Sequence, residues 1–120
     1  MISCGYTRLL VWQKSMDLVE TIYEATKFLP KEERYALSDQ MRRAAISIPS
    51  NIAEGHARNS IKSFLHFMSI AQGSRAELET QLLICVRLRY LTEAKTIPII
   101  IQCQEIGKML YALCRKYEDQ

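Results

Sequence analysis

The chain has 120 residues, of which 48% are hydrophobic and 24% are charged, a composition typical of one globular domain without room for a second independent core. The formal net charge of +3 is too small to prove a nucleic-acid ligand by itself. The longest strongly apolar run, residues 97–101, is far shorter than the about 20 residues that a membrane-spanning helix needs. We therefore expect a single domain over residues 1–120 and no membrane contact.

The first half of the chain predicts two helices. Apolar residues recur at spacings of three and four over residues 10–28, and Pro30 ends this pattern because its ring disfavours a helical backbone in the residue before it. A charged connector, residues 31–34, leads to a second helix over residues 35–55, for which Gly55 is the expected terminator. Pro49 lies inside this helix, so we expect a kink that tertiary packing must hold.

The second half predicts two more helices. Ser60 can cap a third helix over residues 60–90, whose apolar positions cover more than one stripe and so predict a second buried surface. Gly73 lies in its middle and predicts close approach of another helix. Thr92 or Thr96 can cap a fourth helix over residues 93–117. The β-branched run 97–101 has no partner strand elsewhere, so a helix is favoured there.

Four long helices joined by short connectors predict an all-α fold, because short connectors place consecutive helices antiparallel. We therefore expect an antiparallel up-down-up-down four-helix bundle. The four cysteines form no C-x-x-C pair and no signal peptide precedes them, which argues against a disulfide framework and predicts a reduced, cytoplasmic protein. Cys85, Cys103 and Cys114 fall in apolar helical patterns and are expected to pack in the core.

Basic residues gather in the middle of the chain. Between Gln40 and Leu91, seven cations face only Glu54, Glu77 and Glu79, which leaves +4 on this segment. An acidic partner is expected to dock there, although solvated faces and intrachain ion pairs would explain the same residues. The candidate nucleic-acid contacts are Arg42, Arg43, Arg58, Lys62, Arg75, Arg87 and Arg89.

A polar line runs along the second helix, at steps of three and four residues. Glutamine, serine and asparagine in such a line indicate hydrogen bonds to specific partners, since buried polar groups must be paired. Two interpretations stay open: an internal polar network with Glu77 and Gln81 of the third helix, or a contact to a ligand or another subunit. The line consists of Gln40, Arg43, Ser47, Asn51 and Glu54.

The sequence contains no H-E-x-x-H, G-x-G-x-x-G, P-loop or G-x-S-x-G motif, and neither His56 nor His66 is spaced for zinc. It also lacks the Glu-x-x-His pairs of di-metal bundles. We therefore expect no metal, no cofactor, no small-molecule substrate and no catalysis. An unconventional site built from Glu54, His56 and Arg58 stays open as a residual alternative.

Residues 40–55, QMRRAAISIPSNIAEG, resemble the signature of the four-helix bundle proteins encoded in intervening sequences of bacterial large-subunit ribosomal RNA genes. The resemblance extends to residues 10–14, 29–35 and 71–79. It places Arg42, Arg43 and Arg58 in or beside the signature, where guanidinium groups suit phosphate recognition, and leaves the other four cations as weaker candidates. The apolar run 97–101 departs from the charged equivalent expected of the family.

That family is similar in fold to the accessory variability proteins of diversity-generating retroelements. This likeness implies a homopentameric barrel that binds RNA or DNA through basic surfaces and associates with a reverse transcriptase. A pentamer would also cover the second apolar surface of the third helix. The alternative function is a protein-interaction scaffold that does not bind nucleic acid directly.

Overall fold

The computed structural model describes residues 4–118, and these residues contain helices but no strand. All four predicted helices are confirmed, with bounds within three residues of those expected, whereas the two short 3-10 helices were not predicted. The order is η1 (Gly5–Arg8), α1 (Leu10–Thr26), η2 (Lys31–Glu33), α2 (Leu37–Ala57), α3 (Ile61–Arg87) and α4 (Glu93–Glu118).

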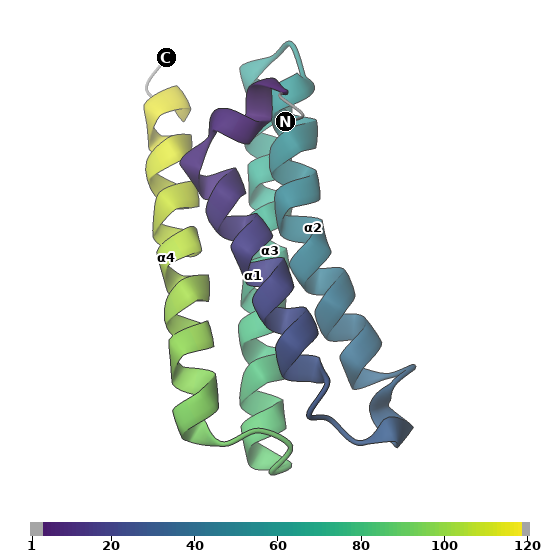
Figure 1. Cartoon of the computed structure of the whole chain (residues 1–120). Coiled ribbons are helices and arrows are strands. Elements are labelled where there is room, and N and C mark those ends of the chain that lie inside the picture. The colour runs from purple at the N-terminus through teal and green to yellow at the C-terminus, as the bar shows by residue number, and fades with distance from the viewer. Residues whose placement is uncertain (1–3, 119–120) are drawn as a thin grey trace.

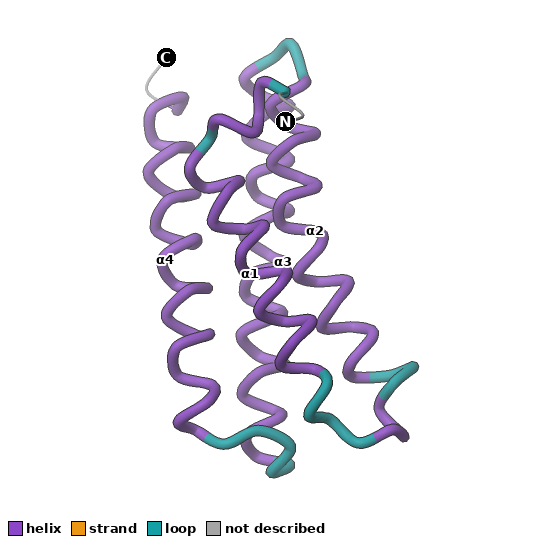
Figure 2. The backbone as a smooth tube through the Cα atoms, viewed as in Figure 1, coloured by secondary structure: helices purple, strands orange, loops and turns teal. Residues whose placement is uncertain are grey.

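The four helices run alternately down and up, and each packs against its two neighbours around the bundle (Figure 1). The antiparallel up-down-up-down bundle is thereby confirmed. Loops are confined to the two ends of the bundle (Figure 2). The α1–α2 and α3–α4 connectors lie at one end, hereafter the connector end, and the α2–α3 turn lies at the other (Figure 1).

The core forms along the centre of the bundle from residues at helical spacing on all four helices. Burial of these apolar side chains, rather than helix propensity alone, supplies the main driving force for folding. No helix in residues 4–118 is long and apolar enough to cross a membrane. The largest fully buried side chains are Leu18, Ile22, Met41, Ile48, Ile52, Met68, Leu78, Leu82, Cys85, Cys103, Ile106 and Leu110.

Side-chain caps begin the last two helices, as predicted. The backbone N–H of Ser63 donates to Ser60 Oγ over 3.1 Å at the start of α3. At the start of α4, the N–H of Lys95 donates to Thr92 Oγ1 over 3.1 Å, so Thr92 rather than Thr96 provides the cap. Helix α2 continues without a break through the buried Pro49, which the surrounding core holds in place.

The expectation about Gly73 is wrong, because a Cβ atom built there would meet nothing within 4 Å and the residue is exposed. Close approach of another helix occurs instead at Gly55, whereas Gly107 faces the side chain of Arg75. A Cβ at Gly55, which lies within α2 rather than ending it, would come within 3.0 Å of Phe67 Cβ on α3. A Cβ at Gly107 of α4 would come within 2.6 Å of Arg75 Nε.

The four cysteines are free thiols, and Cys85 and Cys103 are fully buried in the core. Burial raises the pKa of Cys85 to about 11 and that of Cys103 to about 12, from an ordinary value of 9.0. Cys114 is half-buried, and burial raises its thiol pKa as well. These side chains act as small apolar groups, as the sequence predicts.

Alkaline pH is therefore expected to destabilise the fold. Above about pH 9 the unfolded chain loses its thiol protons while the folded chain keeps them, so the free energy of unfolding falls as pH rises toward the folded-state values. Chemical denaturation from pH 8 to pH 11 measures this slope. The double variant Cys85→Ala and Cys103→Ala should show a flatter slope, and an unchanged slope would contradict the assignment.

Candidate anion-binding site

A basic pocket lies where α1 ends and α2 begins, at the connector end of the bundle. Its volume is about 350 Å³. Four of the residues that line it are cationic and none is a carboxylate, so the pocket favours an anion. The lining consists of Thr26, Lys27, Leu29, Pro30, Lys31, Arg34, Ser38 and Arg42.

The path of the α1–α2 connector builds this pocket. Helix α1 ends at Thr26, the buried Leu29 anchors the following turn, and Pro30 adopts an extended conformation with ψ near 154°. The chain then passes through η2 before α2 starts at Leu37. This path brings cations from the end of α1, the connector and the second turn of α2 around one recess.

Arg42 is held in a defined position on the wall of the pocket. Its Nε–H donates to Thr26 Oγ1 over 2.9 Å, and its Cζ lies 4.4 Å from the centre of the Tyr23 ring. The Thr26 hydroxyl, which is buried, lies 2.9 Å from the Ile22 carbonyl oxygen that accepts its proton. The two terminal amino groups of Arg42 make no hydrogen bond within residues 4–118, so they are available to an anion.

The remaining polar groups differ in burial. Ser38 is only 8% exposed, and its hydroxyl makes no hydrogen bond to any residue that the structure describes. Lys27, Lys31 and Arg34 are exposed, and Lys27 forms an ion pair of 3.0 Å with Glu24. The largely buried residues Thr26 and Ser38 therefore form the floor of the pocket, and the exposed cations form its rim.

The carboxylate of Glu33, in the α1–α2 connector, is directed away from the pocket. Glu33 Oε2 accepts the hydroxyl proton of Tyr90 over 2.9 Å, which ties the α1–α2 connector to the end of α3. This hydrogen bond is the main cause of the raised pKa of Tyr90. Because Glu33 faces Tyr90 and does not line the pocket, it does not neutralise the cations Lys31, Arg34 and Arg42 there.

The predicted cations do not form one surface. Arg43 pairs with Asp39 at 2.9 Å, Arg58 with Glu54 at 2.6 Å, and Arg75 with Glu79 at 2.6 Å. These three arginines therefore form intrachain ion pairs, which is the alternative to an acidic partner that the sequence left open. Lys62 lies in the first turn of α3, whereas Arg87 and Arg89 lie at the connector end, and all three are exposed.

Only Arg42 among the predicted cations lines the basic pocket. Sequence reasoning missed Lys27, Lys31 and Arg34 because they precede the segment with the largest charge excess. The feature of the sequence that could have pointed to these cations is the run of charged residues 31–34, directly after Pro30.

The polar line on α2 is divided in the structure. Ser47 Oγ lies 2.7 Å from Ser74 Oγ of α3, and Asn51 Nδ2 donates to the Ser47 carbonyl over 2.8 Å. Within the described part of the chain, no hydrogen bond joins this line to Glu77, which is exposed, or to the buried Gln81, whose Oε1 has no partner. Gln40, Arg43 and Glu54 are exposed, so the α2–α3 link consists of Ser47, Asn51 and Ser74.

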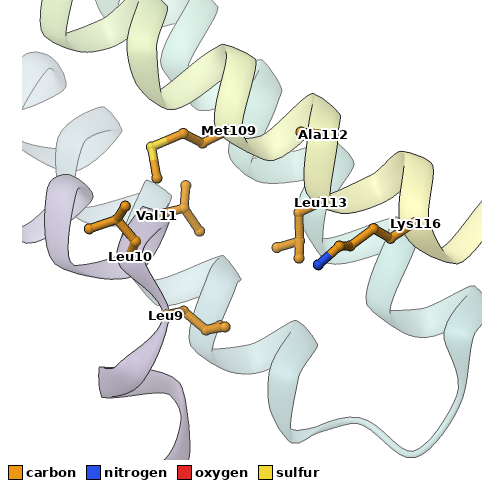
Figure 3. Close-up of a pocket in the computed structure, with 7 residues that line it drawn as sticks. All are labelled: Leu9, Leu10, Val11, Met109, Ala112, Leu113 and Lys116. Carbon is orange, nitrogen blue, oxygen red and sulfur yellow. The ribbon is translucent and has the colours of Figure 1, made fainter.

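A second cavity is apolar and lies between the start of α1 and the end of α4 (Figure 3). Its volume is about 290 Å³, and Lys116 is the one charged residue in its lining. No group of three or more histidine, cysteine or carboxylate side chains in residues 4–118 could hold a metal ion. The other lining residues are Leu9, Leu10, Val11, Met109, Ala112 and Leu113.

Comparisons with known proteins agree with this architecture. Residues 7–112 match the family described as 23S rRNA-intervening sequence protein. A crystal structure of a protein of unknown function from the S23 ribosomal protein family of Bacteroides thetaiotaomicron superimposes with a TM-score of 0.81 at 29% identity, covering 88% of this chain and 98% of that one. No match is found among curated proteins. With almost its whole length matched, the chain belongs to the 23S rRNA-intervening sequence protein family.

Proposed function

We propose that this protein is a non-catalytic, homo-oligomeric accessory protein that binds the phosphate groups of RNA or DNA. The observation that carries the proposal is the basic pocket, where four cations and two hydroxyls surround a recess without a carboxylate. Guanidinium and ammonium groups recognise phosphate through charge-assisted hydrogen bonds. Contacts of this kind carry no sequence information, so binding should depend little on base sequence.

Self-association is part of the proposal, and exposed apolar residues support it. Gln72 Nε2 donates to the Gly107 carbonyl, and the Phe64 ring packs on Tyr117, so the antiparallel register places Leu83 at the level of Ile97. Leu83 of α3 and Ile97 and Ile101 of α4 are each more than half exposed, as is Leu88 directly after α3, and all four lie near the connector end. Exposing this patch of four apolar side chains to water is unfavourable, and a second copy of the chain could cover it. The family resemblance makes a pentamer the assembly that we propose.

The variant Ile101→Glu should separate the subunits, because a carboxylate in a buried apolar interface is left without a partner. Ile101 is 55% exposed in the single chain, so the fold of each subunit should lose less than about 0.5 kcal/mol. Light scattering measures the mass of the assembly, and circular dichroism measures the melting temperature of the variant. An unchanged oligomer would show that this patch is not the interface.

A scaffold that binds another protein is the second candidate, and the same exposed apolar patch favours it. In this case a partner such as a reverse transcriptase would cover Leu83 and Ile101, and the basic pocket would serve solubility alone. Co-purification of a partner that survives nuclease treatment would support the scaffold.

In either case we place the protein in the reducing cytoplasm, which its four free thiols fit.

Size-exclusion chromatography with light scattering, run with and without a structured RNA, tests the proposal in one experiment. We expect an oligomer that elutes earlier and gains the mass of RNA at low salt. A monomer that ignores the RNA would refute both the oligomer and the nucleic-acid ligand. An oligomer that ignores RNA would leave the scaffold as the better description.

A further inference from the structure

We propose that the basic pocket recognises the terminal phosphate of a nucleic-acid strand, the phosphomonoester at its 5′ or 3′ end, rather than an internal phosphodiester. This inference rests on the proposed function and names the part of the nucleic acid that enters the pocket. It follows from the charge, the depth and the donor groups of that pocket.

The charge of the pocket suits a phosphomonoester. A terminal phosphate carries about −1.5 to −2 charges at pH 7 and presents three free oxygens. An internal phosphodiester carries one charge and presents two free oxygens. The lining supplies Lys27, Lys31, Arg34 and Arg42 without a carboxylate. Even if Lys27 stays paired with Glu24, three cations face the ligand, which exceeds what one phosphodiester would neutralise.

The depth of the pocket also favours a chain end. Its floor is buried, since Thr26 and Leu29 are 4% and 8% exposed, whereas the three cations at its rim are exposed. An internal phosphate is tethered on both sides, so the strand would have to fold sharply to bring it down to this floor. A terminal phosphate is tethered on one side and can enter while the strand leaves past the rim.

The donor groups converge on such a ligand from the wall and the floor. Thr26 holds Nε of Arg42 at 2.9 Å, which leaves the terminal amino groups for two phosphate oxygens. Ser38 offers a hydroxyl that is otherwise without a partner in the described chain, in a side chain more than nine-tenths buried. Its Oγ is not itself a fully buried atom, so the hydroxyl is open to the pocket and can donate to the third oxygen of a phosphate.

The test measures the affinity of the full-length protein for three single-stranded RNAs of one sequence, by fluorescence anisotropy at constant moderate salt. One RNA carries a 5′-phosphate, one a 3′-phosphate and one hydroxyls at both ends. We expect one of the phosphorylated strands to bind about tenfold more tightly than the strand with hydroxyl ends, as a hydrogen-bonded charged group would give. Inorganic phosphate and a mononucleotide serve as free competitors.

Variants then assign the preference to the pocket. Ser38→Ala and Arg42→Gln should each reduce the ratio between phosphorylated and hydroxyl-ended strands, whereas Lys108→Gln, which removes an exposed cation from α4, should leave the ratio unchanged. If Arg42→Gln lowers stability, Ser38→Ala and Arg42→Lys still report on the pocket. A ratio that falls equally in the Lys108 variant would reflect net charge alone and would overturn the assignment.

The outcomes separate this inference from the function on which it rests. Equal, measurable affinity for all three RNAs would overturn the end-recognition proposal and leave nucleic-acid binding standing. Absence of binding to every RNA at low salt would refute the proposed function itself. Inorganic phosphate or the mononucleotide binding as tightly as the phosphorylated strand would reassign the pocket to a small ligand and also overturn the proposal.

Discussion

Replacing Gly55 by valine is expected to lower the free energy of unfolding by about 3 kcal/mol, at the upper end of the range for overpacked cores. A Cβ there would lie 3.0 Å from Phe67 Cβ and 3.3 Å from the Phe64 carbonyl oxygen. The carbonyl oxygen is part of the α3 backbone and the Cβ atom is bonded directly to it, so neither atom can move away unless the helix moves. Met68 Cε, at 2.7 Å, is the flexible end of a side chain and can move.

Gly73→Ala is the matched control, because Gly73 is also a helical glycine but faces open space. Alanine should raise the free energy of unfolding there by about 1 kcal/mol, through helix propensity and the smaller entropy of the unfolded chain. Urea denaturation of both variants gives the comparison. Equal stabilisation by substitutions at the two positions would mean that α2 and α3 do not approach closely at Gly55.

The second large effect concerns RNA affinity. Arg42→Glu should weaken binding at low salt by about a hundredfold, because it removes charge-assisted hydrogen bonds and places a carboxylate on the wall of the basic pocket. Equilibrium anisotropy with a labelled single-stranded RNA measures the loss. The unfolding transition should be recorded alongside, since Arg42 also contacts Thr26 and Tyr23.

Arg43→Glu provides the comparison at the neighbouring position of α2. The Arg43 side chain is 79% exposed, pairs with Asp39 and lies outside the pocket, so its reversal should weaken binding only modestly. Equal losses in the two variants would show that general charge, and not the pocket, determines affinity.

Much of the fold follows from local patterns in the sequence. Helical spacing of apolar residues, the caps at Ser60 and Thr92 and the break at Pro30 are properties of short segments, and the structure confirms each. The expectation of a helix crossing at Gly73 was wrong, although the spacing of the core residues could have shown it. It lies two residues after the buried Ala71, about 200° around the helix, and so on the side away from the core.

The site was harder to predict than the helices. The ion pairs of Arg43, Arg58 and Arg75 all join residues four apart on one helix, so spacing alone would have identified them. The basic pocket instead joins Thr26 to Arg42, sixteen residues away, through a connector whose path depends on tertiary packing. No periodic pattern encodes that path, which is why Lys31, Arg34 and Ser38 were missed.

Phosphate binding through the basic pocket is tested most directly by the salt dependence of RNA affinity. The logarithm of the association constant should fall as the logarithm of salt concentration rises, with a slope of about −0.7 for each phosphate that the protein neutralises on a single strand, or about 2.6-fold per phosphate between 50 and 200 mM salt. In Arg42→Gln the slope should be shallower, because one phosphate contact is weakened. Affinity that does not change with salt, or no binding at the lowest salt, would contradict the proposed function.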